Sequence, residues 1–187
     1  MKSFILTILT AFAVVADGSV HLPRFEESPT LDHRAQSSTQ TCGEVAELVP
    51  FFEVYSPSLT LHYYTTFDFN VTAYITGDTA MFLGVAALIF PFPDTSTVPF
   101  YTLRSTTHSA YFFTANETER TQALANGYTN WNTAGYIYPE QICGSVPLYR
   151  LHLVATNSDY MYTTSTTERD DAIFNKGFTY EGTAGYV

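Results

Sequence analysis

The sequence predicts a mainly β domain with short helices (α+β), built from three strand–strand–helix–strand repeats in a pseudo-threefold, trefoil-like or compact three-bladed domain. Val-Pro dipeptides recur at 49–50, 98–99 and 146–147, and each opens a segment that alternates apolar with mixed residues. An aromatic segment ending in threonine follows each dipeptide, and a segment with a central alanine closes each copy. Because a unit of this size cannot bury its own apolar face, we expect the three copies to share one core.

The chain opens with residues typical of a signal peptide at 1–16. Lys2 precedes an apolar run over 4–15, and Val14 and Ala16 are the small residues that signal peptidase requires. The run is shorter than the roughly 20 residues of a bilayer-spanning helix. The sequence therefore predicts a secreted, extracellular protein without membrane insertion.

The rest of the chain divides into a leader and one domain. Residues 17–41 are rich in Ser, Thr, Pro, Glu and His, which predicts a disordered leader or a propeptide. Residues 42–187 are enough for one domain with a core. We divide this domain into repeats at 49–97, 98–145 and 146–187.

The two opening strands of each repeat are expected to pair. The first strands read VPFFEVY, VPFYTLR and VPLYRLH, and the second strands read LHYYT, AYFFT and DYMYT. Aligning the second strands on their last threonines places three aromatic residues on one face: Tyr64, Phe113 and Tyr162.

A short helix is expected next in repeats two and three. In each, a capping residue precedes a glutamate by three positions, as in a capping box: Asn116 and Glu119, Ser165 and Glu168. Gly127 and Gly177 stand where a left-handed residue ends a helix. Repeat one has DFNVTAYIT instead, whose β-branched and aromatic residues favour an extended or distorted segment, and the sequence leaves open whether this repeat keeps its helix.

The last strand of each repeat is the most uniform. Ala86, Ala134 and Ala184 fall at one aligned position. Small residues in matched strands indicate close approach of backbones near a common axis, so we expect these alanines to be buried together.

Repeat three resembles a known family. VPLYRL, DYMYTTSTTERDDAI and FTYEGTAGYV are similar to motifs of a microbial secreted repeat family of unknown function, the domain of unknown function 5648 type, over about 45–187 in three tandem copies. The resemblance implies an extracellular accessory module, often beside cell-wall or glycan-acting domains, with no accepted activity of its own. The family's usual second-strand histidine falls on His62, Tyr111 and Tyr160, which argues against a role that needs three histidines.

Composition excludes several functions. The formal net charge is −10 and no basic stripe offsets it, so nucleic-acid binding is not expected. The chain has no P-loop, dinucleotide fingerprint or His-Glu-x-x-His motif, so we expect neither a cofactor nor an enzyme. His62, His108 and His152 occupy different positions within their repeats, which argues against a metal site.

A set of acids raises the alternative of a general acid/base pair. They fall instead in the first turns of expected helices, where negative charge complements the helix dipole: Glu117, Glu119, Glu168, Asp170 and Asp171.

The two cysteines and two sequons fit a secreted protein. Cys42 and Cys143 are expected to form a disulfide. Asn70 and Asn116 begin Asn-x-Thr glycosylation sequons. Use of Asn116 as a glycan acceptor conflicts with its expected role as a helix cap.

Aromatic residues provide the predicted ligand site. The chain has 14 Tyr, 15 Phe and one Trp, more phenol groups than a small core readily accommodates. We place the site in the loops before the final strands of repeats two and three, at Tyr128, Asn130, Trp131, Asn132, Tyr180 and Glu181. The alternative is that these aromatics belong to the core and ordinary turns.

The favoured function is non-catalytic binding of carbohydrate or cell-surface glycans, as in a lectin. One alternative is a secreted effector or inhibitor that acts on another protein. A weak glycan hydrolase is less favoured, because it requires a pocket with two unpaired acids.

Overall fold

The computed structural model describes residues 41–77, 79–154 and 158–187. The predicted signal peptide and all of the leader except Thr41 lie outside the described residues. The three predicted repeats are called units one to three below.

Each unit contains three strands and a helix. A short 3-10 helix, η1 (Val45–Glu47), precedes unit one, which contains β1 (Val49–Ser56), β2 (Leu61–Thr65), α1 (Asp68–Gly77) and β3 (Met81–Ile89). Unit two contains β4 (Val98–Ser105), β5 (Tyr111–Thr114), α2 (Glu117–Ala125) and β6 (Tyr128–Ile137). Unit three contains β7 (Pro147–Leu153), β8 (Asp159–Thr163), α3 (Thr166–Asn175) and β9 (Thr179–Tyr186).

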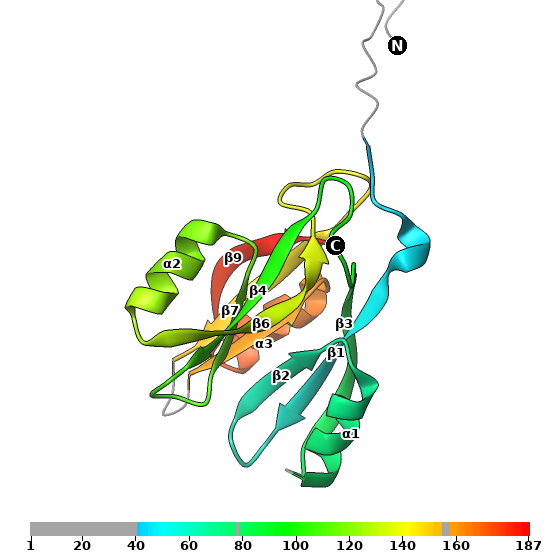
Figure 1. Cartoon of the computed structure of the whole chain (residues 1–187). Coiled ribbons are helices and arrows are strands. Elements are labelled where there is room, and N and C mark those ends of the chain that lie inside the picture. The colour runs from blue at the N-terminus through cyan, green and yellow to red at the C-terminus, as the bar shows by residue number, and fades with distance from the viewer. Residues whose placement is uncertain (1–40, 78, 155–157) are drawn as a thin grey trace, which may run out of the picture. The chain divides into compact units, whose positions relative to one another are not determined.

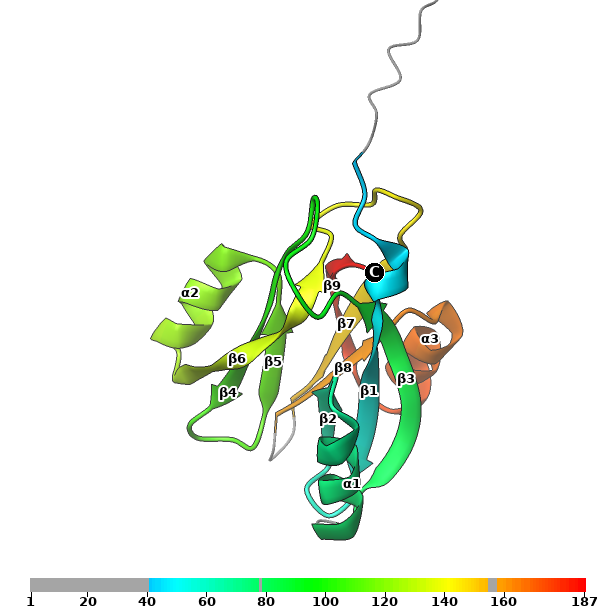
Figure 2. The same cartoon turned by 45° about the vertical axis from the view of Figure 1, so that its right-hand side comes forward.

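Three separate antiparallel sheets of three strands result, in the orders β2-β1-β3, β5-β4-β6 and β8-β7-β9. The strand that opens with Val-Pro is central in each sheet (Figure 1). The helices lie at the periphery of the three sheets, with α2 and α3 on opposite sides in Figure 2. The predicted mainly β class with short helices is therefore confirmed. Among the described helices, none combines the length and hydropathy that crossing a membrane requires.

The caps of α2 and α3 match the sequence pattern. The Asn116 side chain accepts from the backbone N–H groups of Thr118 and Glu119, and Ser165 accepts from that of Glu168. Gly127 and Gly177 have φ of 86° and 78°, which a residue without Cβ adopts readily.

Repeat one keeps its helix, because residues 68–77 form helix α1, so the alternative of an extended segment was wrong. The carbonyl of Phe67 accepts from the N–H groups of Asn70 and Val71, which closes the first turn. Tyr74 stacks on Tyr63 of β2 at a centroid distance of 4.5 Å. Packing against the sheet thus outweighs the poor intrinsic helix propensity of the segment.

Each third strand carries two bulges. The register between first and third strand shifts twice in every unit, and each shift leaves one residue of the third strand without a direct partner. The first set of such residues is Leu83, Trp131 and Glu181, and the second is Ala86, Ala134 and Ala184. Bulges redirect side chains, so these six positions differ in orientation from the rest of the strand.

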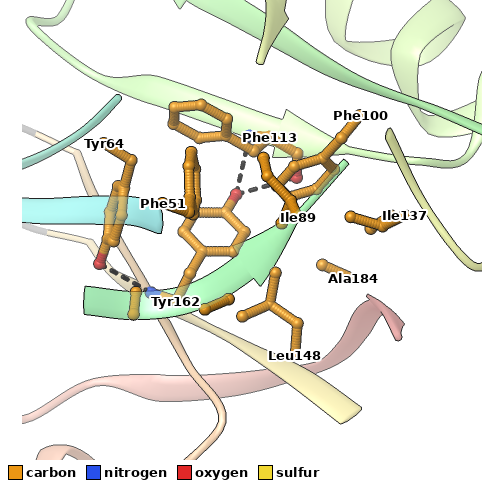
Figure 3. Close-up of a cluster of buried hydrophobic side chains, with 11 residues drawn as sticks. Phe51, Tyr64, Ile89, Phe100, Phe113, Ile137, Leu148, Tyr162 and Ala184 are labelled. Carbon is orange, nitrogen blue, oxygen red and sulfur yellow. Dashed lines mark hydrogen bonds between the residues drawn. The ribbon is translucent and has the colours of Figure 1, made fainter. Parts of the chain in front are cut away.

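All three units contribute to one core (Figure 3). The rings of Tyr64, Phe113 and Tyr162 contact one another pairwise, with centroids 5.4–5.7 Å apart. Tyr162 donates its hydroxyl to the carbonyl of Phe113, and the hydroxyl of Tyr64 accepts from the N–H of Tyr162. The buried phenols therefore have partners, as burial requires.

The aligned alanines adjoin this core. Ala86 and Ala184 are buried in it, and Ala134 is partly buried and packs against it. The expectation that they lie together is thus confirmed, although only two of the three are fully buried.

The predicted disulfide is present between Cys42 and Cys143. It joins the segment before β1 to the connection before β7, and no described cysteine is free.

Candidate ligand-binding site

The predicted ligand residues lie on strands rather than in loops, which corrects the sequence analysis. Tyr128, Asn130, Trp131 and Asn132 belong to β6, and Tyr180 and Glu181 belong to β9. These strands begin within two residues of Gly127 and Gly177, so the expected loops have almost no length.

Three hollows lie at corresponding boundaries between units. Each is lined by the second strand of one unit and the third strand of the next, and we name each after one lining residue. The Trp131 hollow lies between units one and two, the Arg150 hollow between units two and three, and the His62 hollow between units three and one.

The Arg150 hollow encloses about 310 Å³. Helix α2 contributes amides and a carboxylate, while β5, β6 and β8 contribute aromatic rings. Its lining is Phe112, Glu119, Gln122, Ala123, Asn126, Tyr128, Arg150, Tyr160 and Glu181.

Arg150 organises the charged side of this hollow. Its side chain is buried, and it donates to both carboxylate oxygens of Glu119 at 2.9 and 2.8 Å. Its Nε donates to Glu181 at 2.9 Å. The guanidinium also lies over the ring of Phe112, 4.8 Å from the centroid. Arg150 therefore fixes two carboxylates from different units in one place.

Both carboxylates remain accessible. Their side chains are 35% and 29% exposed for Glu119 and Glu181, so each can accept a further hydrogen bond from a ligand. Hydrogen bonds from Arg150 lower the pKa of Glu119 from its ordinary value of 4.5, against the opposing effect of partial burial. Glu119 is therefore an acceptor at neutral pH.

An aromatic wall faces these acids. Tyr128 and Tyr160 pack on Phe112, with centroids 6.1 and 5.1 Å away. Burial, followed by a hydrogen bond with Tyr128, raises the pKa of the Tyr160 phenol. His152 stacks on Tyr160 at 4.3 Å and approaches Glu181 at 3.2 Å. The phenol of Tyr160 thus stays protonated at physiological pH. Contacts with Phe112 and His152 restrain its ring.

The Trp131 hollow is narrower, with a volume of about 50 Å³. Trp131 is 55% exposed at its bulge, with the Arg104 guanidinium 5.2 Å from its ring centroid and Tyr111 edge-to-face at 6.2 Å. The lining is Tyr63, Tyr64, Thr65, Thr66, Phe67, Asn70, Tyr74, Thr102, Tyr111, Trp131, Asn132, Thr133 and Ala134. The predicted pair Trp131 and Asn132 is therefore together.

The His62 hollow is the most apolar of the three and encloses about 460 Å³. Its lining is Tyr55, Thr60, His62, Leu83, Leu153, Asp159, Lys176 and Phe178. Buried Asp159 accepts from the backbone N–H of His62 at 2.8 Å and lies 2.8 Å from its ring Nδ1. These two polar groups satisfy each other, which leaves an apolar wall for a ligand.

Asn130 and Tyr180 contact helix arginines and are not among the described residues that line the three hollows. Asn130 accepts from Arg120 Nε at 3.0 Å. Arg169 lies over the ring of Tyr180 at 5.7 Å. The six predicted residues are thus divided among the Trp131 hollow, the Arg150 hollow and these helix contacts.

Sequence reasoning missed Arg150, and for Glu119 it favoured the role of a helix-start acid over that of a general acid or base. The available signal was positional: Glu53, Thr102 and Arg150 occupy one aligned place in the central strands, and all three are polar. A polar residue that recurs at a buried position of a central strand requires a hydrogen-bond partner there, and so points to a polar site.

The two sequons have different surroundings. Asn70 lies in α1, donates to Thr65 Oγ1 at 3.1 Å and lines the Trp131 hollow. Asn116 is exposed, and its capping bonds use only Oδ1. Since N-glycans attach through Nδ2, capping and glycosylation at Asn116 are compatible, and the conflict expected from the sequence does not arise.

The described residues contain no group of three or more His, Cys, Asp or Glu that could hold a metal ion. His62 contacts Asp159 in the His62 hollow, His152 contacts Glu181 and is not among the lining residues of the three hollows, and His108 is exposed.

Comparison with known families gives one match. The family model of the Domain of unknown function (DUF5648) matches residues 50–187, which is more than half of the chain. No curated protein and no solved structure matches the chain.

Proposed function

The chain belongs to the Domain of unknown function (DUF5648) family, and from that premise we propose that it is a secreted, non-catalytic module that binds carbohydrate, such as the glycans of cell surfaces. The observation that carries this proposal is the Arg150 hollow. It combines two fixed carboxylates, two side-chain amides and an aromatic wall in about 310 Å³.

A site that binds a sugar ring needs both hydrogen-bond acceptors and aromatic surfaces. The hydroxyls of the sugar donate well to ionised carboxylates, and its apolar C–H faces pack on aromatic rings. Glu119 and Glu181 supply the first, and the partly exposed Tyr128 and Tyr160 supply the second. The volume lies near the lower end of about 300–1,000 Å³ for small-molecule sites, which fits one sugar unit.

Preorganisation favours binding over catalysis here. Arg150 holds both acids through its own ion pairs, so a ligand need not order them. The same ion pairs argue against the hydrolase alternative at this site, because neither Glu119 nor Glu181 is the unpaired acid that such a mechanism requires.

We also propose that the three units are tandem copies of one repeat about a pseudo-threefold axis, in a trefoil-like arrangement. The similar spacing of the Tyr64, Phe113 and Tyr162 rings supports this, as do the matched bulges. The hollows have diverged in lining, so the three should not bind the same sugar equally well.

Secretion and glycosylation belong to the same proposal. The disulfide supports an oxidising compartment, which agrees with the predicted signal peptide. Exposed Asn116 is the better glycan acceptor, because the Nδ2 of Asn70 already donates to Thr65.

A glycan array probed with the full secreted chain tests the function. We expect retention on neutral oligosaccharides, and Glu181→Gln should weaken binding of a retained glycan by about tenfold or more, because a charged acceptor becomes neutral. The exposed Glu140→Gln is the matched control and should bind as wild type. Calorimetry gives the affinities, and circular dichroism checks the fold.

Two results contradict the proposal. Either no glycan is retained, or Glu181→Gln and Glu140→Gln bind equally well.

A second candidate, action on another secreted protein, rests on a different observation. Five apolar residues of β3 are each about half exposed: Met81, Phe82, Leu83, Val85 and Leu88. Unit two has Asn130 and Thr133 where unit one has Phe82 and Val85. An exposed apolar strand in one unit alone is the asymmetric surface that an inhibitor or effector needs.

One double variant separates the two candidates. Phe82→Ser/Val85→Ser leaves the Arg150 hollow untouched and should retain glycan binding. If the chain is an inhibitor, wild type should inhibit a purified secreted protease or glycosidase and the double variant should lose that inhibition. Equal inhibition by both proteins would exclude β3 as the contact.

A further inference from the structure

The Trp131 hollow differs from the other two in charge. Among the described residues that line it, none carries a charged side chain. The rings of Tyr63, Tyr74 and Tyr111 form much of its wall, together with the amides of Asn70 and Asn132. A group that fits here is neutral and has both an apolar and a hydrogen-bonding part.

One buried hydroxyl in this hollow has no partner. Thr102 is 3% exposed, and its Oγ1 is the buried side-chain oxygen for which the described residues offer no hydrogen bond. Leaving such a group unsatisfied costs about 1–3 kcal/mol. Thr102 lines the hollow, so rotation of its side chain would bring this hydroxyl to a ligand that can pair with it.

The three units differ in how the polar residue at this strand position is paired. Thr102 occupies the same strand position as Arg150 and Glu53. Arg150 is satisfied by Glu119 and Glu181, and Glu53 accepts from the Tyr64 hydroxyl at 2.7 Å. Only at Thr102, among these three positions, does the described chain leave the polar group without a partner.

Trp131 lies at the mouth of the same hollow. Its ring is more than half exposed, and Arg104 and Tyr111 contact it, which restrains its orientation. A sugar ring packed on the exposed part of the indole would place one of its substituents beside Asn132 and the hollow.

We propose that the Trp131 hollow binds the acetamido group of a 2-acetamido sugar, which rests on the carbohydrate function proposed above. The group is neutral, and its amide can pair with Thr102 Oγ1, once this side chain rotates toward the hollow, and with a side-chain amide. Its methyl packs on the tyrosine rings. A hydroxyl alone would leave the rings facing water, and a methyl alone would leave Thr102 unpaired.

Size agrees with this assignment. About 50 Å³ exceeds the roughly 30 Å³ share of one water molecule and is far below the volume that a whole sugar ring needs. The hollow therefore accepts a substituent while the ring stays outside on Trp131.

The test compares two ligands that differ at carbon 2. Tri-N-acetylchitotriose and cellotriose share the β-1,4 backbone, and we expect the acetylated trimer to bind the full secreted chain at least tenfold more tightly. Thr102→Val keeps the shape of the side chain and removes its hydroxyl. It should weaken binding of the acetylated trimer by about tenfold, leave cellotriose binding unchanged, and not lower the melting temperature.

Thr121→Val, exposed on α2 outside the hollow, is the matched control and should change neither affinity. Equal affinity for the two trimers, or wild-type binding by Thr102→Val, overturns the acetamido assignment; the latter result leaves only a buried water at Thr102. The Glu181→Gln variant distinguishes failure of the acetamido assignment from failure of the carbohydrate function. If it weakens cellotriose binding as expected, the carbohydrate function stands without the acetamido subsite, whereas absence of any glycan binding removes both.

Discussion

One position in the central strands shows how single residues differentiate the units. Glu53, Thr102 and Arg150 are buried and polar at the same place in β1, β4 and β7. Burial of such groups is unfavourable unless partners compensate. Arg150 gains two carboxylates, Glu53 gains a phenol and a nearby histidine, and Thr102 gains nothing from the described chain.

Glu53 should make stability depend on pH. Burial raises its pKa above the ordinary 4.5, helped by the charges of Glu168 and Asp159 and opposed by His62 and the Tyr64 hydrogen bond. A raised pKa means that the folded state binds the proton more tightly than the unfolded state. The stabilisation is complete below pH 4.5 and is lost as pH rises through the folded pKa.

Glu53→Gln should remove that loss, because glutamine stays neutral and still accepts from Tyr64. Urea unfolding between pH 4 and pH 8 should show the variant gaining stability relative to wild type as pH rises. Exposed Glu47→Gln should track wild type throughout. A constant difference between Glu53→Gln and wild type across this range would mean that Glu53 ionises normally.

At the scale of single residues, the sequence identified those whose role follows from a short pattern or from the residue type alone. The N-caps, the left-handed glycines and the cysteine pair each follow from a pattern within a few residues or from the redox compartment. The pairing of Arg150 with Glu119 joins residues of different units across 31 positions. No local pattern specifies such a contact, since it depends on how two units pack.

Among the secondary-structure elements, the third strands are the most informative. Their approximate positions follow from the aligned alanines, but their bulges do not, because a bulge is a property of pairing between two strands. Trp131 lies at a bulge within β6 and is more than half exposed, whereas the sequence analysis assigned it to a loop, with a core position as the alternative. Helix α1 likewise forms through contacts with β2 that its own sequence does not show.

Gly135 lies where β6 meets the end of unit one. The N–H groups of Phe90 and Tyr136 each donate to the other residue's carbonyl, at 3.0 and 2.8 Å. A Cβ at Gly135 would lie 2.6 Å from the Phe90 carbonyl oxygen and 2.7 Å from Ile89 Cδ1. Because one of these atoms is backbone, side-chain rotation cannot relieve the contact.

Gly135→Ala should therefore destabilise the fold by about 1–3 kcal/mol. Gly77→Ala is the matched control, since a Cβ there meets nothing within 4 Å, and it should leave stability unchanged or slightly higher. Denaturant unfolding of both variants measures the difference. Equal midpoints for the two would show that the boundary between units one and two adjusts freely.

For the molecule as a whole, the three units and their shared core were predictable because each repeats the same strand pattern with one aromatic and one alanine at fixed places. The hollows were not predictable. They form between units, and their linings combine the least similar positions of the repeat, as Leu83, Trp131 and Glu181 show at the first bulge. The units therefore resemble one another in the core and differ at their boundaries, where a ligand would bind.

The disulfide constrains the molecule as a whole. It links Cys42 to Cys143 across 101 positions and so encloses units one and two in one covalent loop. On the chain-entropy view, a loop of about this length stabilises by roughly 4–5 kcal/mol. The Cys42→Ser/Cys143→Ser variant should lower the free energy of unfolding by an amount of that order.

The native fold should survive the loss of that bond. The segment next to Cys42 is also held by the Gly43 N–H, which donates to the Tyr138 hydroxyl at 2.9 Å, and by the Glu44 N–H, which donates to Asp94 at 2.8 Å. We therefore expect the double variant to retain its circular dichroism at 25 °C and to unfold at lower denaturant than wild type, with wild type plus reductant matching it. Intact mass after alkylation without reductant should show no modified thiol in the secreted wild type. Two alkylated thiols, or a variant as stable as wild type, would contradict the view that this bond constrains the unfolded chain.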